Sequence, residues 1–156
     1  MIKMTTFEAF FGIQLPLEER TYKNTPKRMY NCGGYALGNY GWYCPYSEDD
    51  ENYMNEVFEY GEVTEEEEKI FVEYMLGTIE DLRIIEDISE LLENEYAIAF
   101  RISNDDFHFV KRGGNGCWYE KMGGSNCINR MEKEEVFSDC WHDRYDGELY
   151  LFAKKC

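Results

Sequence analysis

The sequence predicts an α+β fold in which helices come first and an antiparallel sheet follows. Residues 63–76 carry a helix-start signal and apolar residues at helical spacing. Residues 95–122 alternate between apolar and polar residues and contain a glycine-rich turn, as hairpin strands do. The chain has 156 residues, of which 17% are aromatic, so it is long enough to bury a core, and we predict a single domain over residues 1–156.

Two short helices are expected in the first part of the chain. In "TTFEAFF", Thr5 precedes Glu8 by three residues, which is the spacing of a capping box. Asn31 is a good N-cap for a helix that begins at Cys32, and Gly38 is a suitable stop. The candidate nucleophile discussed below therefore stands at a helix N-terminus.

The middle of the chain gives the clearest helix. Thr64 and Glu67 form a capping box, and an inward stripe is supplied by Phe71, Tyr74 and Met75. The apolar residues of "TIEDLRIIEDISELLEN" (78–94) continue at helical spacing. The alternative is a break into a short strand near Arg83 to Glu86.

The period changes to two after this segment. "EYAIAFRIS" (95–103) and "FHFVKR" (107–112) are predicted strands. "GGNG" is a strong hairpin turn, "CWYEKM" (117–122) is the returning strand, and "ELYLFAKK" (148–155) is a last strand.

The net charge of −16 is concentrated in an acidic helical segment, residues 48–95. This segment holds 19 acidic residues against two basic ones, Lys69 and Arg83, whereas the rest of the chain is close to neutral. Phosphates would be repelled by it, so direct nucleic-acid binding is not expected. The segment suits either a solvated helical face or contact with a basic protein surface, including imitation of a nucleic acid.

The chain contains six cysteines and two histidines. No two cysteines have the C-x-x-C spacing, and no metal site or cofactor is expected. The first 20 residues lack a long apolar centre and a small-residue cleavage site, which argues against a signal peptide. We therefore expect a cytoplasmic protein (in a bacterial or host cell) with reduced thiols; in a secreted protein the cysteines would form a disulfide framework. No apolar run reaches the roughly 20 residues that cross a bilayer, so no membrane contact is expected.

Cys32 is the candidate nucleophile. A helix N-terminus favours the thiolate, and a cysteine nucleophile also needs a base and a group that orients this base. His108 is the preferred base because it stands between two phenylalanines in a predicted strand, whereas His142 stands in a turn-like stretch. The alternative is that Cys32 is a small core residue and His108 an ordinary, partly buried histidine.

Glu120 is the candidate orienting group. A hairpin loop centred on Gly114 sets Glu120 directly opposite His108, where the carboxylate can accept the Nδ1–H of the imidazole. A two-residue Asn-Gly turn would instead put Glu120 on the opposite face of the sheet. Asp106, two residues before His108, is the fallback orienting group.

Two patches of the chain, "NCGGYALG" (31–38) and "DFHFVKRGGNGCWYEKMGG" (106–124), carry a resemblance. They resemble papain-like and NlpC-type cysteine-peptidase-fold proteins of bacteria and phages, with the pattern N-C-x-x-Y-A-L, then D-F-H-F, then G-x-W-x-x-K-x-G. The matching positions are Asn31, Cys32, Tyr35, Ala36, Leu37, Asp106, Phe107, His108, Phe109, Gly116, Trp118, Lys121 and Gly123. The chain departs from the pattern at Glu120, where a histidine is frequent.

The resemblance implies a papain-like fold and acyl transfer, in which Cys32 attacks a carbonyl and His108 moves the proton. The backbone N–H of Cys32 and one more donor would meet the oxyanion. Asn24 and Asn31 are candidates for this donor, although Asn31 also serves as the helix cap. The expected function is a thiol hydrolase (a peptidase, amidase or deamidase) with a peptide or amide substrate.

Two alternatives remain. The first is a non-enzymatic acidic inhibitor or interaction protein, such as a phage counter-defence (anti-CRISPR-like) factor on the same fold. The second is a structural or immunity-type protein without an active thiol.

Overall fold

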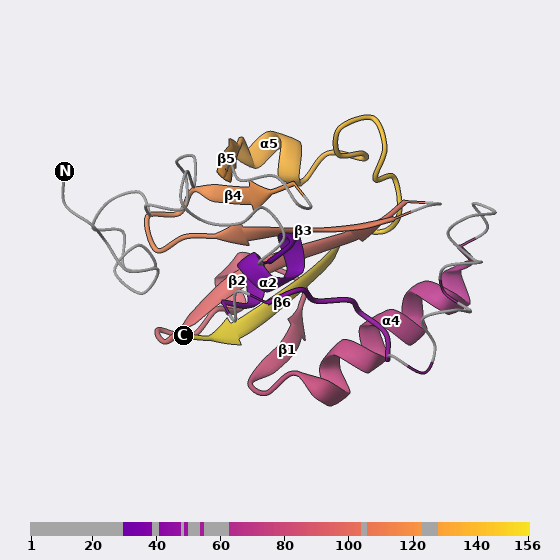
Figure 1. The fold of residues 1–156 in the computed structure, drawn as a ribbon. Coiled ribbons are helices and arrows are strands. Elements are labelled where there is room, and N and C mark those ends of the chain that lie inside the picture. Colours follow the sequence, from indigo (N-terminus) through magenta and orange to yellow (C-terminus); the bar gives the residue numbers. More distant parts are fainter. Residues whose placement is uncertain are drawn as a thin grey trace.

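An antiparallel six-stranded sheet is the centre of the fold (Figure 1). The computed structural model describes residues 30–38, 41–47, 49, 54, 63–103, 106–122 and 128–156. The strand order is β1-β6-β2-β3-β4-β5, with bounds β1 (Leu82–Ile85), β2 (Glu95–Ile102), β3 (Phe107–Arg112), β4 (Trp118–Lys121), β5 (Ile128–Met131) and β6 (Tyr150–Lys155). The α+β prediction is confirmed, and the expected helix at "TTFEAFF" lies outside the described residues.

The two faces of the sheet are covered by different parts of the chain. Helices α2 (Cys32–Leu37) and α4 (Glu65–Thr78) pack on one face, in a core that includes Phe71, Met75, Ile98, Phe100, Phe109 and Phe152. Helix α5 (Lys133–Val136) and the turn after it pack on the other, in a core that includes Ala97, Ala99, Val110, Trp118, Trp141 and Tyr145. Full burial of one such large apolar side chain contributes about 1.5–3 kcal/mol. Neighbouring residues of β2 therefore point into different cores, as the period of a strand requires.

Helix α2 begins and ends where the sequence predicts. The side chain of Asn31 caps it by accepting from the backbone N–H of Gly34 at 3.0 Å. Gly38 ends it in the left-handed conformation, with φ of 75°. All six residues of the helix are buried, so Cys32 is held in a fixed position against the sheet.

The glycine pair after Cys32 allows a loop to cross close to the helix. A Cβ atom on Gly34 would lie 1.8 Å from the carbonyl oxygen of Gly41, and one on Gly33 would lie 2.8 Å from the Tyr43 ring. The amide of Asn31 holds the same loop, because its Oδ1 accepts from Tyr43 N at 3.0 Å and its Nδ2 donates to Tyr43 O at 2.7 Å. The "NCGG" sequence therefore shapes one wall of the thiol environment.

Helix α4 confirms the strongest helix prediction. Thr64 caps it, and the reciprocal bonds of the capping box with Glu67 are both present. Phe71 and Met75 are fully buried, whereas Tyr74 is only partly buried. Figure 1 shows α4 running beside β1, which is the outer strand of the sheet at this end.

The prediction of a continued helix over residues 78–94 is wrong, and its alternative, a break into a strand, is right. Strand β1 pairs with β6, and a short 3₁₀ helix η3 (Ile88–Glu90) follows it. Leu82 joins one core and Ile85 the other, so apolar residues three apart serve both faces of a sheet here. Arg83 also bridges to Glu95 of β2 at 2.7 Å. These long-range contacts outweigh a local helical pattern.

The hairpin register differs from the predicted one. Lys111 pairs with Tyr119, and the loop is centred on Asn115 rather than Gly114. Gly113 N donates to Cys117 O at 2.8 Å, and Gly116 takes the left-handed conformation with φ of 83°. This is a three-residue loop with glycine at its left-handed position, which is a common hairpin connection. The spacing of residues in the sequence did not distinguish it from hairpin loops of other lengths.

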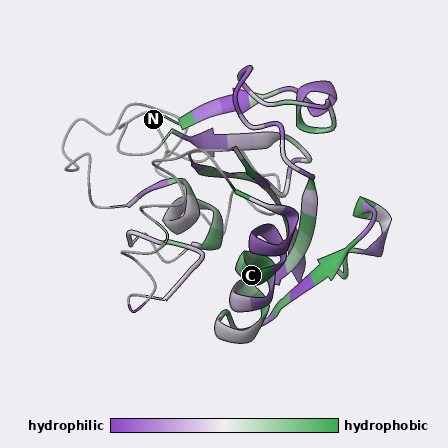
Figure 2. Cartoon of the chain, turned by 90° about the vertical axis from the view of Figure 1, so that its right-hand side faces the viewer, coloured by the Kyte–Doolittle hydropathy of each residue, from purple (hydrophilic) through white to green (hydrophobic). Residues whose placement is uncertain are grey.

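Figure 2 shows hydrophobic (green) and hydrophilic (purple) residues next to one another along the strands. The sequence predicted strand β6, but it did not predict strand β5 or helix α5. Within the described ranges, no helix is long and apolar enough to cross a membrane.

Candidate functional site

Four side chains from four parts of the chain lie together, three of them buried and the fourth, His142, exposed. Cys32 comes from α2, His108 from β3, Glu120 from β4, and His142 from the turn after α5. The Nε2 atom of His108 lies 3.3 Å from Glu120 Oε1, and the Nε2 atom of His142 lies 2.6 Å from the same oxygen. Cys32 and His108 line the same cleft, and Cys32 contributes to the raised pKa of His108. The structure thus brings together the three residues proposed from sequence and adds a second histidine.

The His108 ring is buried, and its neighbours favour its protonated, positively charged form. Its exposed fraction is 1%. Burial by itself lowers the pKa of His108, but hydrogen bonds to Cys32 and Glu120 outweigh this effect and raise the pKa to about 9. The protonated imidazole is therefore the form that this environment favours.

Glu120 reaches His108 diagonally rather than directly across the hairpin. The observed register, continued along the strands, sets Val110 opposite Glu120, so His108 and Glu120 are diagonal neighbours on one face. The predicted face is right and the predicted direct pairing is wrong. The ring atom that meets Glu120 is Nε2 and not the expected Nδ1, which leaves Nδ1 as the nitrogen available to Cys32.

The carboxyl group of Glu120 is held between two imidazoles. Burial raises its pKa, but the hydrogen bond and charge of His108, together with His142, outweigh burial and lower the pKa of Glu120 below its ordinary value. The ionised carboxylate is therefore the stable form at neutral pH.

Tyr145 packs against the His108 ring. The two rings stack at 5.1 Å between centroids with 24° between planes. The Tyr145 hydroxyl lies 3.4 Å from Asp106 Oδ2, and Asp106 also accepts from Phe107 N and Arg144. Glu120 thus makes the ring contact for which Asp106 was the fallback, and Asp106 acts on the ring through Tyr145.

The turn that carries His142 has an unusual backbone. His142 and Asp143 both have φ of 55°, a left-handed conformation that is uncommon for residues other than glycine. Backbone hydrogen bonds between Trp141 and Tyr145 close the turn, and the Trp141 indole donates to Val136 O at 2.9 Å. The turn is therefore anchored at both ends, and it presents His142 to Glu120. Its polar, turn-like sequence was the only signal of this role.

Two buried lysines, Lys111 and Lys121, lie beneath α2. Neither was predicted to have a role of its own. Lys121 donates to Tyr30 O, and Lys111 donates to Tyr35 O at 3.3 Å. Burial lowers the pKa of Lys121, and its attraction to Cys32 opposes this effect. Inward-facing lysines on predicted strands are the signal that could have found them.

The two asparagines proposed as oxyanion donors have different outcomes. The side-chain oxygen of Asn31 accepts from Gly34 N and Tyr43 N, and its nitrogen donates to Tyr43 O, so its observed role is to cap the helix and hold the loop. Asn24 lies outside the described residues.

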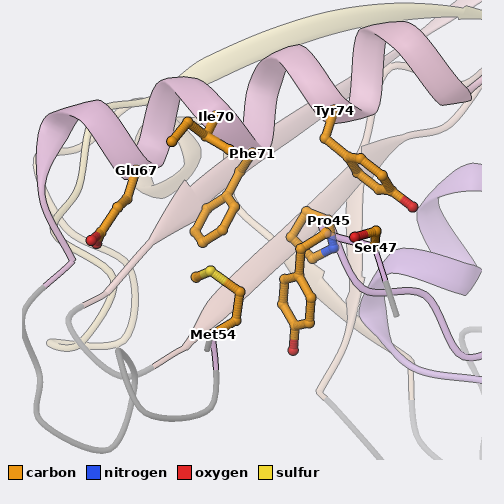
Figure 3. Close-up of a pocket in the computed structure, with 8 residues that line it drawn as sticks. Pro45, Ser47, Met54, Glu67, Ile70, Phe71 and Tyr74 are labelled. Carbon is orange, nitrogen blue, oxygen red and sulfur yellow. The ribbon is translucent and has the colours of Figure 1, made fainter. Parts of the chain in front are cut away.

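A cleft of about 210 Å³ opens onto the thiol, between Trp42, Tyr46 and Tyr145. Tyr46 also lines a second, apolar pocket of about 160 Å³ against α4. Figure 3 shows the Phe71 ring of α4 pointing towards Met54 across this pocket, with Glu67 at one end. The cleft at the thiol and this apolar pocket therefore share Tyr46 as a lining residue.

The five described cysteines, Cys32, Cys44, Cys117, Cys140 and Cys156, carry free thiols. Comparison of the chain with protein-family models, with curated proteins and with solved structures finds no match in any of the three.

Proposed function

We propose that this chain is a thiol hydrolase of papain-like fold that cleaves an amide bond in the cytoplasm. Cys32 is the nucleophile, His108 the base and acid, and Glu120 the orienting group. The observation that carries the proposal is that Cys32 and His108, both buried, line one cleft, and that His108 meets the buried Glu120 at 3.3 Å. The same order of elements, a cysteine on a helix, a histidine on a strand and a polar residue on the next strand, underlies the sequence resemblance to papain-like proteins.

The reaction follows from these positions. His108 takes the proton of Cys32, and the sulfur attacks the carbonyl carbon of the amide. The oxyanion that forms accepts from the backbone N–H of Cys32, one of the first-turn donors of a helix that have no acceptor within it. The C–N bond then breaks, and the amine leaves with the proton from His108. Water, deprotonated by His108, attacks the thioester, releases the acid and returns the proton to the sulfur.

The walls of the cleft favour a substrate with an apolar side chain. Trp42, Tyr46 and Tyr145 bound the space next to the thiol, and Tyr46 connects it to the pocket against α4. We therefore expect peptides or amides with an aliphatic or aromatic residue near the cleaved bond. The acidic first turn of α4 would favour a basic residue further along.

The test is the rate at which iodoacetamide labels each cysteine near pH 6, read by peptide mass spectrometry. The other cysteines of the chain serve as internal controls. We expect Cys32 to react far faster than the others, and to lose this advantage in His108→Ala and in His108→Gln. Thermal melts of both variants show whether they are folded.

Slow labelling of Cys32 in the folded wild type would overturn the proposal, and so would fast labelling that persists in a folded His108 variant. In either case Cys32 would be a packed core thiol, and the papain-like arrangement would have no catalytic meaning.

An acidic interaction protein, such as a phage counter-defence factor, is the second candidate function. The observation that favours it is the exposure of Glu65 and Glu66 beside Ile70, which is 58% exposed. A pull-down with the wild-type chain would then recover a partner that salt releases. A Glu65→Lys, Glu66→Lys double variant would lose the partner, whereas Cys32→Ala would keep it. Retention by the double variant would reject this candidate.

A further inference from the structure

We propose that His108, Glu120 and His142 form a binding site for a divalent transition metal of the zinc type. The metal would take the imidazole that the thiol uses, so occupancy of the site and proton transfer from Cys32 exclude each other. The metal site follows from its own geometry. Only its effect on proton transfer from Cys32 rests on the proposed function.

The ligand atoms have the separations that such a metal needs. One ring nitrogen from each histidine and a Glu120 carboxylate oxygen all lie within 4.8 Å of one another. Four ligands at about 2.0–2.1 Å in a tetrahedron are separated by about 3.3 Å. His108 Nε2 is 3.3 Å from Glu120 Oε1, and His142 Nε2 is 3.1 Å from Glu120 Oε2.

One distance must change when the metal enters. His142 Nε2 is 2.6 Å from Glu120 Oε1, which is a hydrogen-bond distance and must open by about 0.7 Å. The His142 side chain is 37% exposed, so it has room to move outward. The same exposed side gives the metal its path into the cluster.

The other atoms of the two rings also suit a metal site. Metal-bound histidines usually present their second nitrogen to a carboxylate or another acceptor, which fixes the ring. The Nδ1 atom of His142 lies 3.9 Å from Glu135 Oε1 on α5. Cys32 and His108 line the same cleft, and Nδ1 is the His108 nitrogen that does not meet Glu120. Both histidines therefore turn Nε2 towards the carboxylate and have a partner for the rest of the ring.

The donor set indicates which metal fits. Two imidazoles and one carboxylate suit zinc, cobalt and similar ions better than calcium or magnesium, which prefer oxygen. The set leaves at least one position for water. The chain contains only these two histidines, so the site would use both of them.

Metal binding has a direct consequence for His108. A neutral imidazole that gives its Nε2 lone pair to a metal carries its proton on Nδ1. It then has no lone pair left to accept the proton of Cys32. The metal would thus act as a reversible inhibitor that leaves the sulfur untouched.

The test is a titration of the full chain with Co²⁺ followed by visible absorption, with Zn²⁺ added afterwards to displace it. We expect one equivalent of Co²⁺ to give the bands of low-coordinate cobalt without a sulfur-to-cobalt charge-transfer band. His142→Asn is the main variant, because asparagine tolerates the left-handed backbone at this position. It should weaken Co²⁺ binding at least 100-fold, and Glu135→Gln should weaken it about 10-fold.

Asp143→Asn is the matched control, since it makes the same kind of change at the neighbouring left-handed residue outside the cluster. It should bind Co²⁺ as the wild type does, and so should Cys32→Ala. The proposal is overturned if no cobalt binds, if His142→Asn binds as tightly as the wild type, or if a charge-transfer band disappears in Cys32→Ala. Cobalt binding is measured without thiol chemistry, so slow iodoacetamide labelling would reject the hydrolase and leave the metal site standing.

Discussion

Replacement of Glu120 by glutamine keeps the shape of the side chain and removes the charge that faces His108. At 3.3 Å and an effective dielectric constant of about 20, the attraction between carboxylate and imidazolium is about 5 kcal/mol. His142 shares the same oxygen at 2.6 Å, so we assign roughly half of this attraction, about 2.5 kcal/mol, to His108. A loss of this size lowers the equilibrium constant for forming the charged Cys32–His108 pair between 10-fold and 100-fold.

The assay is the iodoacetamide labelling rate of Cys32 near pH 6 relative to the other cysteines of the same chain. The rate in Glu120→Gln should fall several-fold, and at most by this factor of 10 to 100, because it follows the population of the charged pair. Glu66→Gln is the control, because it makes the same chemical change at an exposed position of α4. If Glu120→Gln is folded and labels at the wild-type rate, Glu120 does not support the His108 charge, and the reasoning fails.

Four other substitutions test the fold around the site. Asn31→Ala removes the helix cap and both bonds to the 41–43 loop, so it should lower the free energy of unfolding by about 2–3 kcal/mol in a urea titration. Gly34→Ala should destabilise by several kcal/mol because its Cβ would meet a backbone oxygen, whereas Gly77→Ala, with open space around it in α4, should stabilise by about 0.5–1 kcal/mol; melting temperatures that move in the same direction would contradict this pair. Glu68→Gln should raise the melting temperature at pH 7. Burial, with neighbouring carboxylates, raises the pKa of Glu68, so the folded state favours the protonated form and loses stability as pH rises above the ordinary glutamate range. The gain from glutamine should vanish near pH 4, and a gain that is equal at both pH values would show that charge is not its cause.

The parts of the fold that were predicted correctly have strong local signals. The caps of α2 and α4 are written in Asn31 and in the Thr64 and Glu67 pair, whose partners lie within three residues. The strands β2, β3 and β4 follow from a period of two around a glycine-rich turn. Sequence patterns predict elements whose hydrogen-bond partners lie close together along the chain, and these elements have such partners.

The parts that were missed depend on distant contacts. Strand β1 exists because β6, some 70 residues later, pairs with it, and no local pattern reports that partner. The sequence left two hairpin registers open, and the observed one is neither, because loops with similar glycines close differently. His142 was set aside because its turn looked like an ordinary polar loop, and only packing shows that the turn is anchored over His108.

The sequence by itself determined the chemistry on offer: one thiol at a helix start, two histidines, and a carboxylate on the strand after the first histidine. It left open whether His108 and Glu120 share a face of the sheet, because that parity depends on the length of the hairpin loop. The tertiary structure alone decided which atoms meet. The diagonal contact through Nε2, the buried lysines under α2 and the second imidazole on Glu120 all arise where separate segments pack together, and the order of residues along the chain contains no measure of those distances.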